Sequence, residues 1–375
     1  MRWLTHILWA MAMGLTLIGC DIYSDEDVAG GAMERDGMRV TFTISSGNPE
    51  FSTSRASSYG NPSLENGTEW ENYVNLAGKD YLFYLFDQDG VFQEILSVKS
   101  ISTTDNITYS VTADVKEKYS NFTIMALVNW GSSVWNMLSN GFAYPVLEKG
   151  VSKIDAIWTT SVGLRVYDTS SKNFMPSQTS HIPMYGARTY SLSAGAFNSE
   201  EIDLGAFYLI RALAKIDVYV AANSGITLNN VQLNCYSNYF HCAPVGMTAM
   251  NDEWGQATDN TMNMNLLQES FSPSTLDFVK IEENLYRLYV PEYPNKRNDV
   301  ESSTISVLMT KNDSYQGGTI TFEGMETTSS ATTTPLNILR NNYYKFCITG
   351  ITEYETNIVI DVVPFDNVSN DLVFE

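Results

Sequence analysis

The chain has 375 residues and a formal net charge of −21, with 43 acidic against 22 basic side chains. A surface this acidic repels nucleic acid and anionic membranes, so neither is an expected partner. The length suits two domains of ordinary size.

The chain begins with the pattern of a bacterial lipoprotein leader. Arg2 supplies the positive charge, Ile7–Ile18 is an apolar run, and Leu17–Cys20 reads L-I-G-C, which is similar to a lipobox. The run is shorter than the roughly 20 apolar residues of a membrane-spanning helix. We therefore expect residues 1–20 to be a signal peptide and Cys20 to carry lipid, palmitate included, as the one attachment to a membrane. The alternative is an ordinary signal peptide with a coincidental cysteine.

The first strand signal of the mature chain lies at residues 38–46. Val40, Phe42 and Ile44 alternate with threonine and serine, which is the period of a half-buried strand. Gly47, Asn48 and Pro49 end the pattern.

The polar run after this strand contains a single arginine, Arg55, followed by Ala56. A protease that cuts after Arg55 would free the strand and leave an apolar groove with unpaired edges. A strand from another subunit could fill that groove by β-augmentation. The alternative is that the strand is simply the first of a sandwich, with Arg55 in a solvated loop.

Strand signals dominate the rest of the chain. Residues 81–86 and 91–96 flank D-Q-D-G and predict a hairpin; the turn resembles the start of a calcium loop but lacks the later glutamate. The best helix candidate is residues 130–141. Further strands are predicted at residues 106–115, 121–128, 216–220, 227–235, 285–290, 302–309, 318–322, 343–348 and 358–363.

The texture of the sequence changes near residue 205, where the longest coherent run begins. In it Ile216, Val218 and Val220 alternate with polar residues, as in a strand. Many strands without long helices between them predict an all-β protein with few short helices and a β-sandwich in each domain. We place the two domains at residues 56–204 and 205–375.

The sequence carries no signature of catalysis. His181 and His241 stand at no metal-ligand spacing, and no nucleophile elbow, phosphate loop or zinc motif is present. Acidic pairs such as Glu200 and Glu201 are typical of a solvated face. Cys235 and Cys242 either form a bridge across a loop or act as small buried hydrophobic residues. We expect neither an enzyme nor a metal or other cofactor.

Several motifs occur in the order of a known family. After the lipobox come S-R-A at residues 54–56, R-A-L-A-K-I-D-V at residues 211–218, Y-V-P-E at residues 289–292 and L-R-N-N-Y-Y-K-F-C-I-T-G-I at residues 339–351. Together they resemble the fimbrillin family, the pilus subunits of the type V pili of Bacteroidales. The resemblance is spread over nearly the whole chain.

The resemblance implies two transthyretin-like β-sandwich domains and export as an outer-membrane lipoprotein. It implies that an arginine-specific protease removes residues 21–55 at the Arg55–Ala56 bond, and that subunits then polymerise by donor-strand exchange into a cell-surface fimbrium that supports adhesion. Arg35 and Arg39 are competing cleavage sites, but a cut at Arg39 would divide the strand.

The expected partners are other pilus subunits, joined by strand addition, and host or bacterial surface ligands. The expected donor is the apolar C-terminal tail, through residues Ile358, Ile360, Val362, Leu372 and Phe374. The alternative is that this tail forms the last strands of the second domain. The roles of stalk, tip and anchor subunit stay open, and a surface lipoprotein that binds glycan or host ligand is the main alternative function. A secreted hydrolase is the third.

Overall fold

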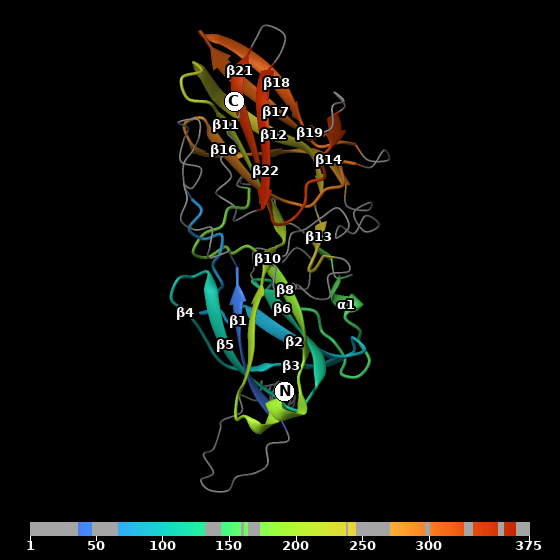
Figure 1. The fold of residues 1–375 in the computed structure, drawn as a ribbon. Helices are drawn as coiled ribbons and strands as arrows, with labels where there is room; N and C mark the ends of the chain where they lie inside the picture. The colour runs from blue at the N-terminus through green and yellow to red at the C-terminus, as the bar shows by residue number, and fades with distance from the viewer. Residues whose placement is uncertain are drawn as a thin grey trace, which may run out of the picture. The chain divides into compact units, whose positions relative to one another are not determined.

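The computed structural model describes residues 37–46, 67–131, 144–158, 161–163, 173–237, 239–244, 271–296, 301–325, 333–351 and 356–364. Most of these residues are in β-strands, and loops and turns make up nearly all of the rest (Figure 1). The helices among them are α1 (Asp155–Trp158) and the 3-10 turn η3 (Ala194–Asn198). The predicted all-β sandwich fold with few short helices is confirmed, whereas the predicted helix at 130–141 falls almost wholly outside the described residues.

The N-terminal part of the described chain forms two sheets. The four-stranded sheet contains β4 (Ser97–Thr103), β5 (Thr108–Val115), β1 (Met38–Ser45) and β9 (Ile202–Tyr208). The five-stranded sheet contains β10 (Ile210–Arg211), β8 (Met184–Ser191), β6 (Asn121–Val128), β2 (Tyr81–Asp87) and β3 (Phe92–Ile95).

The C-terminal part forms a second pair of sheets. One contains β15 (Val279–Glu282), β16 (Leu285–Pro291), β11 (Leu213–Val220), β21 (Asn342–Ile351) and β22 (Thr356–Pro364). The other contains β14 (Phe271–Asp277), β12 (Ile226–Ser237), β17 (Thr304–Lys311) and β18 (Ser314–Thr321). Two short ladders pair β13 (Tyr239–His241) with β7 (Ser161–Gly163), and β19 (Glu323–Met325) with β20 (Thr333–Pro335).

Each pair of sheets encloses a buried apolar core. The first core lies between β1 and β5 on one side and β2 and β6 on the other, and includes Phe42, Val111, Phe83 and Ile124. The second core fills the C-terminal pair of sheets and continues to the opposite face of β2 and β6, for example at Met125. The five-stranded N-terminal sheet is therefore covered on both faces, which explains the unbroken apolar run in β6.

The predicted hairpin at Asp87 is confirmed. β2 pairs with β3, and the Asp87 carboxylate accepts hydrogen bonds from the backbone N–H groups of Asp89, at 2.9 Å, and Val91, at 3.0 Å. Gly90 completes the turn at φ +71°, a conformation that glycine adopts without strain. The aspartate thus shapes a turn by bonding its own loop.

The chain crosses from the first pair of sheets to the second around Ala212. β10 still pairs with β8, whereas β11 pairs with β16 and β21. The expected boundary at residue 205 falls inside β9, which pairs with β1. We propose that the two domains divide at Ala212 instead.

Candidate functional site: the seat of β1

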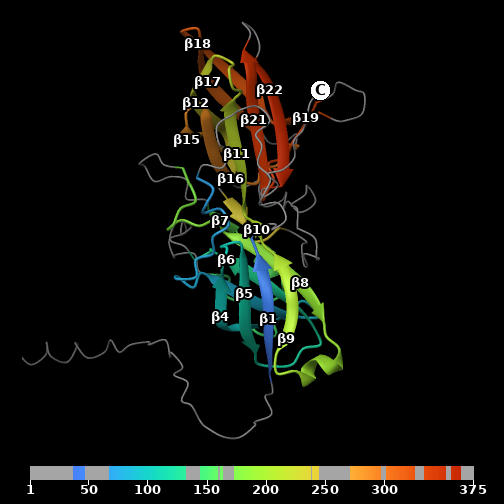
Figure 2. The same ribbon diagram turned by 60° about the vertical axis from the view of Figure 1, so that its left-hand side comes forward.

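Strand β1 lies in the interior of its sheet. It pairs with β5 in antiparallel fashion over its whole length, from Met38 opposite Val115 to Ser45 opposite Thr108, and with β9 in parallel. Figure 2 shows β1 between these two neighbours. Both edges of the strand are hydrogen-bonded, so its loss would leave one unpaired edge on β5 and another on β9.

The inner face of β1 is buried in the first core. Val40 and Ile44 are fully buried, and Phe42 is almost so, with its ring 5.1 Å from that of Phe83 in an edge-to-face contact. Three such side chains contribute about 5–9 kcal/mol as an upper estimate. The structure thus places the three residues of the predicted removable strand together on one face. Whether the strand is removed stays a prediction.

The outer face of β1 carries a partly exposed ion pair. The Arg39 guanidinium lies 2.8 Å from the carboxylate of Asp114, its cross-strand partner on β5. Lys99 Nζ lies 3.5 Å from the same carboxylate. Partial burial acts to raise the pKa of Asp114, but the Arg39 hydrogen bond and both positive charges outweigh it and hold this pKa below its ordinary value. Both partners of the Arg39 pair are about one-third exposed, so the pair contributes little to stability.

The C-terminal end of β1 is held by polar contacts. Ser46, the residue after the strand, is fully buried; its N–H donates to the Ile107 carbonyl at 2.9 Å and its hydroxyl donates to the Asn72 carbonyl at 2.8 Å. The Ser46 carbonyl accepts a hydrogen bond from Arg211 Nη2 at 2.8 Å. Arg211 belongs to β10, so the strand end is tied to a residue 165 positions along the chain.

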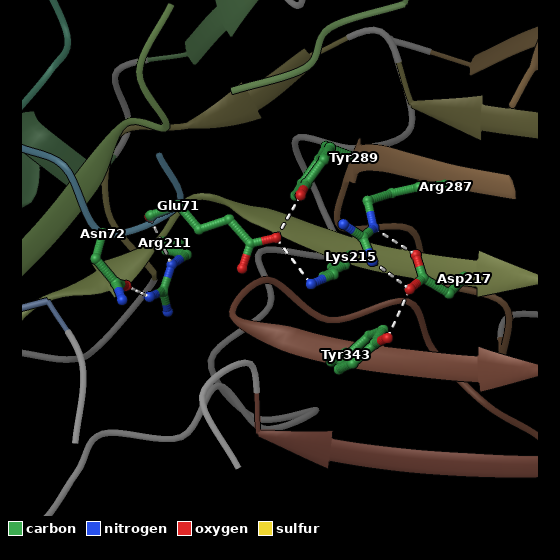
Figure 3. Close-up of polar contacts among 8 residues, drawn as sticks. All are labelled: Glu71, Asn72, Arg211, Lys215, Asp217, Arg287, Tyr289 and Tyr343. Carbon is green, nitrogen blue, oxygen red and sulfur yellow. Dashed lines mark hydrogen bonds and ion pairs between the residues drawn. The ribbon is translucent and has the colours of Figure 1, made fainter. Parts of the chain in front are cut away.

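Arg211 is fully buried and forms hydrogen bonds with residues next to both pairs of sheets; Figure 3 shows it beside Glu71 and Asn72. Its Nε donates to the Glu71 carbonyl at 3.1 Å, and its Nη2 also donates to the Asn72 side chain. Its Nη1 donates to Asn341 Oδ1 at 3.2 Å, and Asn341 directly precedes β21 of the second pair. A buried guanidinium is tolerated where such oxygens satisfy its donors.

A second polar cluster continues from Glu71 into the C-terminal sheets (Figure 3). The Glu71 carboxylate pairs with Lys215 of β11 at 2.8 Å and accepts a hydrogen bond from the Tyr289 hydroxyl of β16. Asp217 of β11 pairs with Arg287 of β16 at 2.7 Å. Burial lowers the pKa of Lys215, partly offset by the Glu71 charge.

The cluster is closed by Tyr343 of β21. Its hydroxyl donates to Asp217 Oδ2 at 2.6 Å, and its ring lies 4.5 Å below the Lys215 ammonium in a cation–π contact. Burial, aided by the Asp217 charge, holds the pKa of Tyr343 well above its ordinary value. These groups are paired with one another, so the arrangement fixes strands and offers no obvious nucleophile or base.

Sequence analysis missed this cluster because of one assumption about β11. Alternation of Ile216 and Val218 with Lys215 and Asp217 predicted a half-buried strand, yet all eight residues of β11 are buried. The two charged side chains can be buried because each has an ionic partner: Lys215 pairs with Glu71, and Asp217 pairs with Arg287. The sequence does contain a signal for this cluster. A charged residue stands inside each of several neighbouring apolar strands, as Arg287 does in L-Y-R-L-Y-V.

The C-terminal tail is partly described. Ile358, Ile360 and Val362 lie in β22, which pairs antiparallel with β21 at the edge of its sheet. In this chain the segment is therefore the edge strand of its sheet, and its use as a donor stays a proposal. Leu372 and Phe374 lie outside the described residues.

Some of the remaining predicted sites lie outside the described residues and others lie within them. Cys20, Arg55 and Ala56 lie outside the described residues. Cys235 and Cys242 are free and buried, so the possible bridge between them is absent. Burial raises the pKa of the Cys235 thiol to about 11. Among the described residues, no group of three or more histidine, cysteine and acidic side chains is placed to hold a metal ion, and no helix is long and apolar enough to cross a membrane.

Comparison with known proteins identifies the fold. No family model and no curated protein matches the chain. The tip fimbrial protein Mfa3 from Porphyromonas gingivalis, solved with a C-terminal truncation, matches with a TM-score of 0.53 and 11% identity over 88% of this chain and 99% of that one. At that identity the likeness shows the fold, and this fold agrees with the one implied by the resemblance to fimbrillins.

Two more distant structures are similar over most of their length. A candidate cell adhesion protein from Parabacteroides distasonis has a TM-score of 0.45 and 19% identity over 89% of this chain and 99% of that one. The fimbrial anchor protein Mfa2 from Porphyromonas gingivalis has a TM-score of 0.36 and 10% identity over 87% and 97%.

Proposed function

We propose that the protein is a structural subunit of a cell-surface fimbrium, exported as an outer-membrane lipoprotein, and that it polymerises when β1 is removed and replaced by a strand of another subunit. The position of β1 carries the proposal: the first described strand is interior to its sheet and is connected to all later strands through one segment of the chain, residues 47–66. One cut there, after Arg55, would leave β1 held by non-covalent contacts alone.

The energetics favour retention of β1 until a competitor arrives. The apolar face of Val40, Phe42 and Ile44 and two ladders of main-chain hydrogen bonds would have to be lost together. A strand from a neighbouring subunit restores both, and because donor and groove are different surfaces, such contacts extend into a filament instead of closing. The C-terminal tail is our candidate donor.

The subunit role follows from whether the chain is cut. Arg55 in a polar segment favours a cut subunit over an anchor, which would keep its lipid at Cys20. The apolar C-terminal tail favours a stalk position over a tip position. Adhesion to host or bacterial surface ligands would then be a property of the assembled fimbrium.

Intact mass and N-terminal sequencing of the surface-exposed protein, with and without an arginine-specific protease, test the proposal. We expect an N-terminus at Ala56 and a ladder of oligomers that resists mild detergent. Arg55→Gln should stay uncut and monomeric, while the matched control Arg35→Gln should behave as the natural chain. A blocked N-terminus at Cys20, with monomer alone after protease treatment, would leave an anchor or a glycan-binding lipoprotein.

A further inference from the structure

Two consecutive residues, Glu71 and Asn72, contact both the end of β1 and the second pair of sheets. The Asn72 carbonyl accepts a hydrogen bond from the Ser46 hydroxyl at 2.8 Å. The Glu71 carboxylate lies 2.8 Å from Lys215 Nζ and accepts a hydrogen bond from the Tyr289 hydroxyl. Figure 3 shows the Glu71 side chain extending from this pair of residues toward these two partners. Because one planar peptide unit joins Glu71 to Asn72, a displacement of one residue moves the other. We call the two residues the bridging segment.

Arg211 joins the bridging segment to the end of β1 a second time. Its Nη2 donates to the Ser46 carbonyl at 2.8 Å and also to the Asn72 side chain. Its Nε donates to the Glu71 carbonyl at 3.1 Å. Ser46 and Arg211 are fully buried and Glu71 is nearly so. These contacts therefore lie in the protein interior, where hydrogen bonds and ion pairs are stronger than in water.

Loss of the end of β1 would weaken this arrangement. Arg211 Nη2 would lose a buried acceptor, and a buried charged donor without its acceptor is costly. Water that entered in place of the Ser46 carbonyl would raise the local dielectric constant and weaken the attraction between Glu71 and Lys215. In both cases the bridging segment holds the second pair of sheets less firmly. Thermodynamic linkage requires the reverse as well: a weaker hold on the second pair of sheets makes the end of β1 easier to open.

Other contacts limit the size of this effect. The hydroxyl of Tyr109 on β5 accepts a hydrogen bond from the Val74 N–H at 2.9 Å and lies 3.3 Å from the Asn72 carbonyl. The apolar core of the C-terminal sheets also continues to β2 and β6. Loss of β1 would therefore loosen the junction without separating the two pairs of sheets. Coupling between two sites typically changes an equilibrium constant by about 5- to 150-fold, and with these other contacts in place we expect the lower end of that range.

We propose that the bridging segment and Arg211 couple the seating of β1 to the junction between the two pairs of sheets, so that each stabilises the other. This inference goes beyond the proposed function, because it concerns the uncut chain. One consequence does rest on the proposed function: where a partner strand replaces β1, the junction is firm only in a subunit whose groove is filled to its end.

Native-state hydrogen exchange of the full, uncut chain tests the coupling. The reporters are the amides of Ser46 and Leu209, which donate to carbonyls at the end of β1 and beside it. Amides in the middle of β6 are the reference, so a change in overall stability alone does not imitate the effect. Tyr289→Phe removes the hydroxyl that bonds Glu71 and leaves every contact of β1 in place. We expect the reporters to exchange about three- to tenfold faster relative to β6 in this variant.

Tyr343→Phe is the matched control, because it removes a buried hydroxyl that donates to Asp217 instead of Glu71. It should leave the ratio of reporter exchange to β6 exchange within about twofold of the natural value, since distant sites without shared partners act independently. In Arg211→Lys, which keeps the charge and loses the planar fork, the effect of Tyr289→Phe on this ratio should shrink to less than about twofold. Where Arg211→Lys does not fold, the two tyrosine variants are sufficient for the decision.

Each contrary result overturns the proposal. A ratio that is unchanged in Tyr289→Phe, or that changes equally in both tyrosine variants, means that the junction and the end of β1 are independent. A Tyr289→Phe effect that persists in full in a folded Arg211→Lys chain removes Arg211 from the coupling. None of these measurements involves cleavage, so the proposed function is decided separately, by the N-terminus of the surface-exposed protein.

Discussion

Strands β1 and β11 occupy the same topological position in their sandwiches and are held in different ways. Each pairs with one antiparallel and one parallel neighbour: β1 with β5 and β9, and β11 with β16 and β21. Yet β1 alternates between buried and half-buried residues, whereas every residue of β11 is buried. The two strands share their topology but differ in how deeply their second face is buried.

The outer faces of the two strands contain matched ion pairs. Arg39 of β1 faces Asp114, and Asp217 of β11 faces Arg287, each pair being direct cross-strand partners. The first pair is about one-third exposed, while the second has an exposed fraction of 0% at both side chains. Removal of β1 would expose apolar surface and break an ion pair that is already partly exposed. Removal of β11 would leave buried charged groups without their partners. On this difference we expect β1 to be easier to replace than β11.

The largest expected effect is at the buried pair. Arg287→Leu leaves Asp217 charged and without its bidentate partner in the protein interior, so we expect a loss of about 3–5 kcal/mol in the free energy of unfolding. Urea unfolding followed by circular dichroism measures it. The double variant that also carries Asp217→Leu should recover much of the loss. A cost below about 1 kcal/mol would show that β11 is no better fixed than β1.

The next effect is at the inner face of β1. Phe42→Ala removes a ring packed edge-to-face on Phe83 and leaves a cavity in the first core, with an expected loss of about 3–4 kcal/mol. The neighbouring Thr43→Ala, on the half-buried outer face, serves as the control and should cost less than about 1 kcal/mol. Equal losses in urea unfolding would contradict the one-sided attachment of β1.

Tyr343→Phe should have an intermediate effect, about 1.5–3 kcal/mol, because it removes a hydrogen bond to the charged Asp217. The raised pKa of Tyr343 also gives a pH dependence: its contribution is complete below about pH 10 and is lost as the pH rises, since the unfolded tyrosine ionises first. The variant should therefore lose stability less steeply above pH 10. Tyr315→Phe, at an exposed side chain, is the control and should lose stability above pH 10 as the natural chain does. If Tyr343→Phe also lost stability as steeply as the natural chain above pH 10, the assignment would be contradicted.

The smallest effect is at the exposed pair. Arg39→Ala should cost no more than about 1 kcal/mol at neutral pH. Because Asp114 has a lowered pKa in the folded protein, the contribution of the pair is present above its unfolded value of 3.8 and is lost as the pH falls through the folded value. Unfolding curves at pH 7 and pH 3 should thus differ less for the variant than for the natural chain. A cost near that of Arg287→Leu would abolish the contrast between the two strands.

Local patterns in the sequence predicted the strands well. The alternation of Val40, Phe42 and Ile44 became the buried face of β1, and D-Q-D-G at residues 87–90 became the turn between β2 and β3. Both are properties of neighbouring residues, since side chains alternate across a strand and aspartate and glycine favour tight turns. Predicted strands at 121–128, 285–290 and 343–348 were confirmed for the same reason.

The candidate site depended on contacts that such patterns do not contain. Arg211 meets Ser46 across 165 positions, and Tyr289 meets Glu71 across 218. Period-two alternation also says which side chains share a face but not what covers that face, so Lys215 and Asp217 looked exposed until Glu71 and Arg287 were seen against them.

The sequence by itself thus determined the all-β composition and the strands, the apolar face of β1 among them. Local hydrogen bonding and side-chain alternation suffice for these features. The tertiary structure alone decided that β1 is an interior strand with one half-buried face, and that a buried arginine from β10 donates a hydrogen bond to the residue at its end. These depend on distant segments packing together, where burial changes the energy of each charge by an amount that no local pattern records.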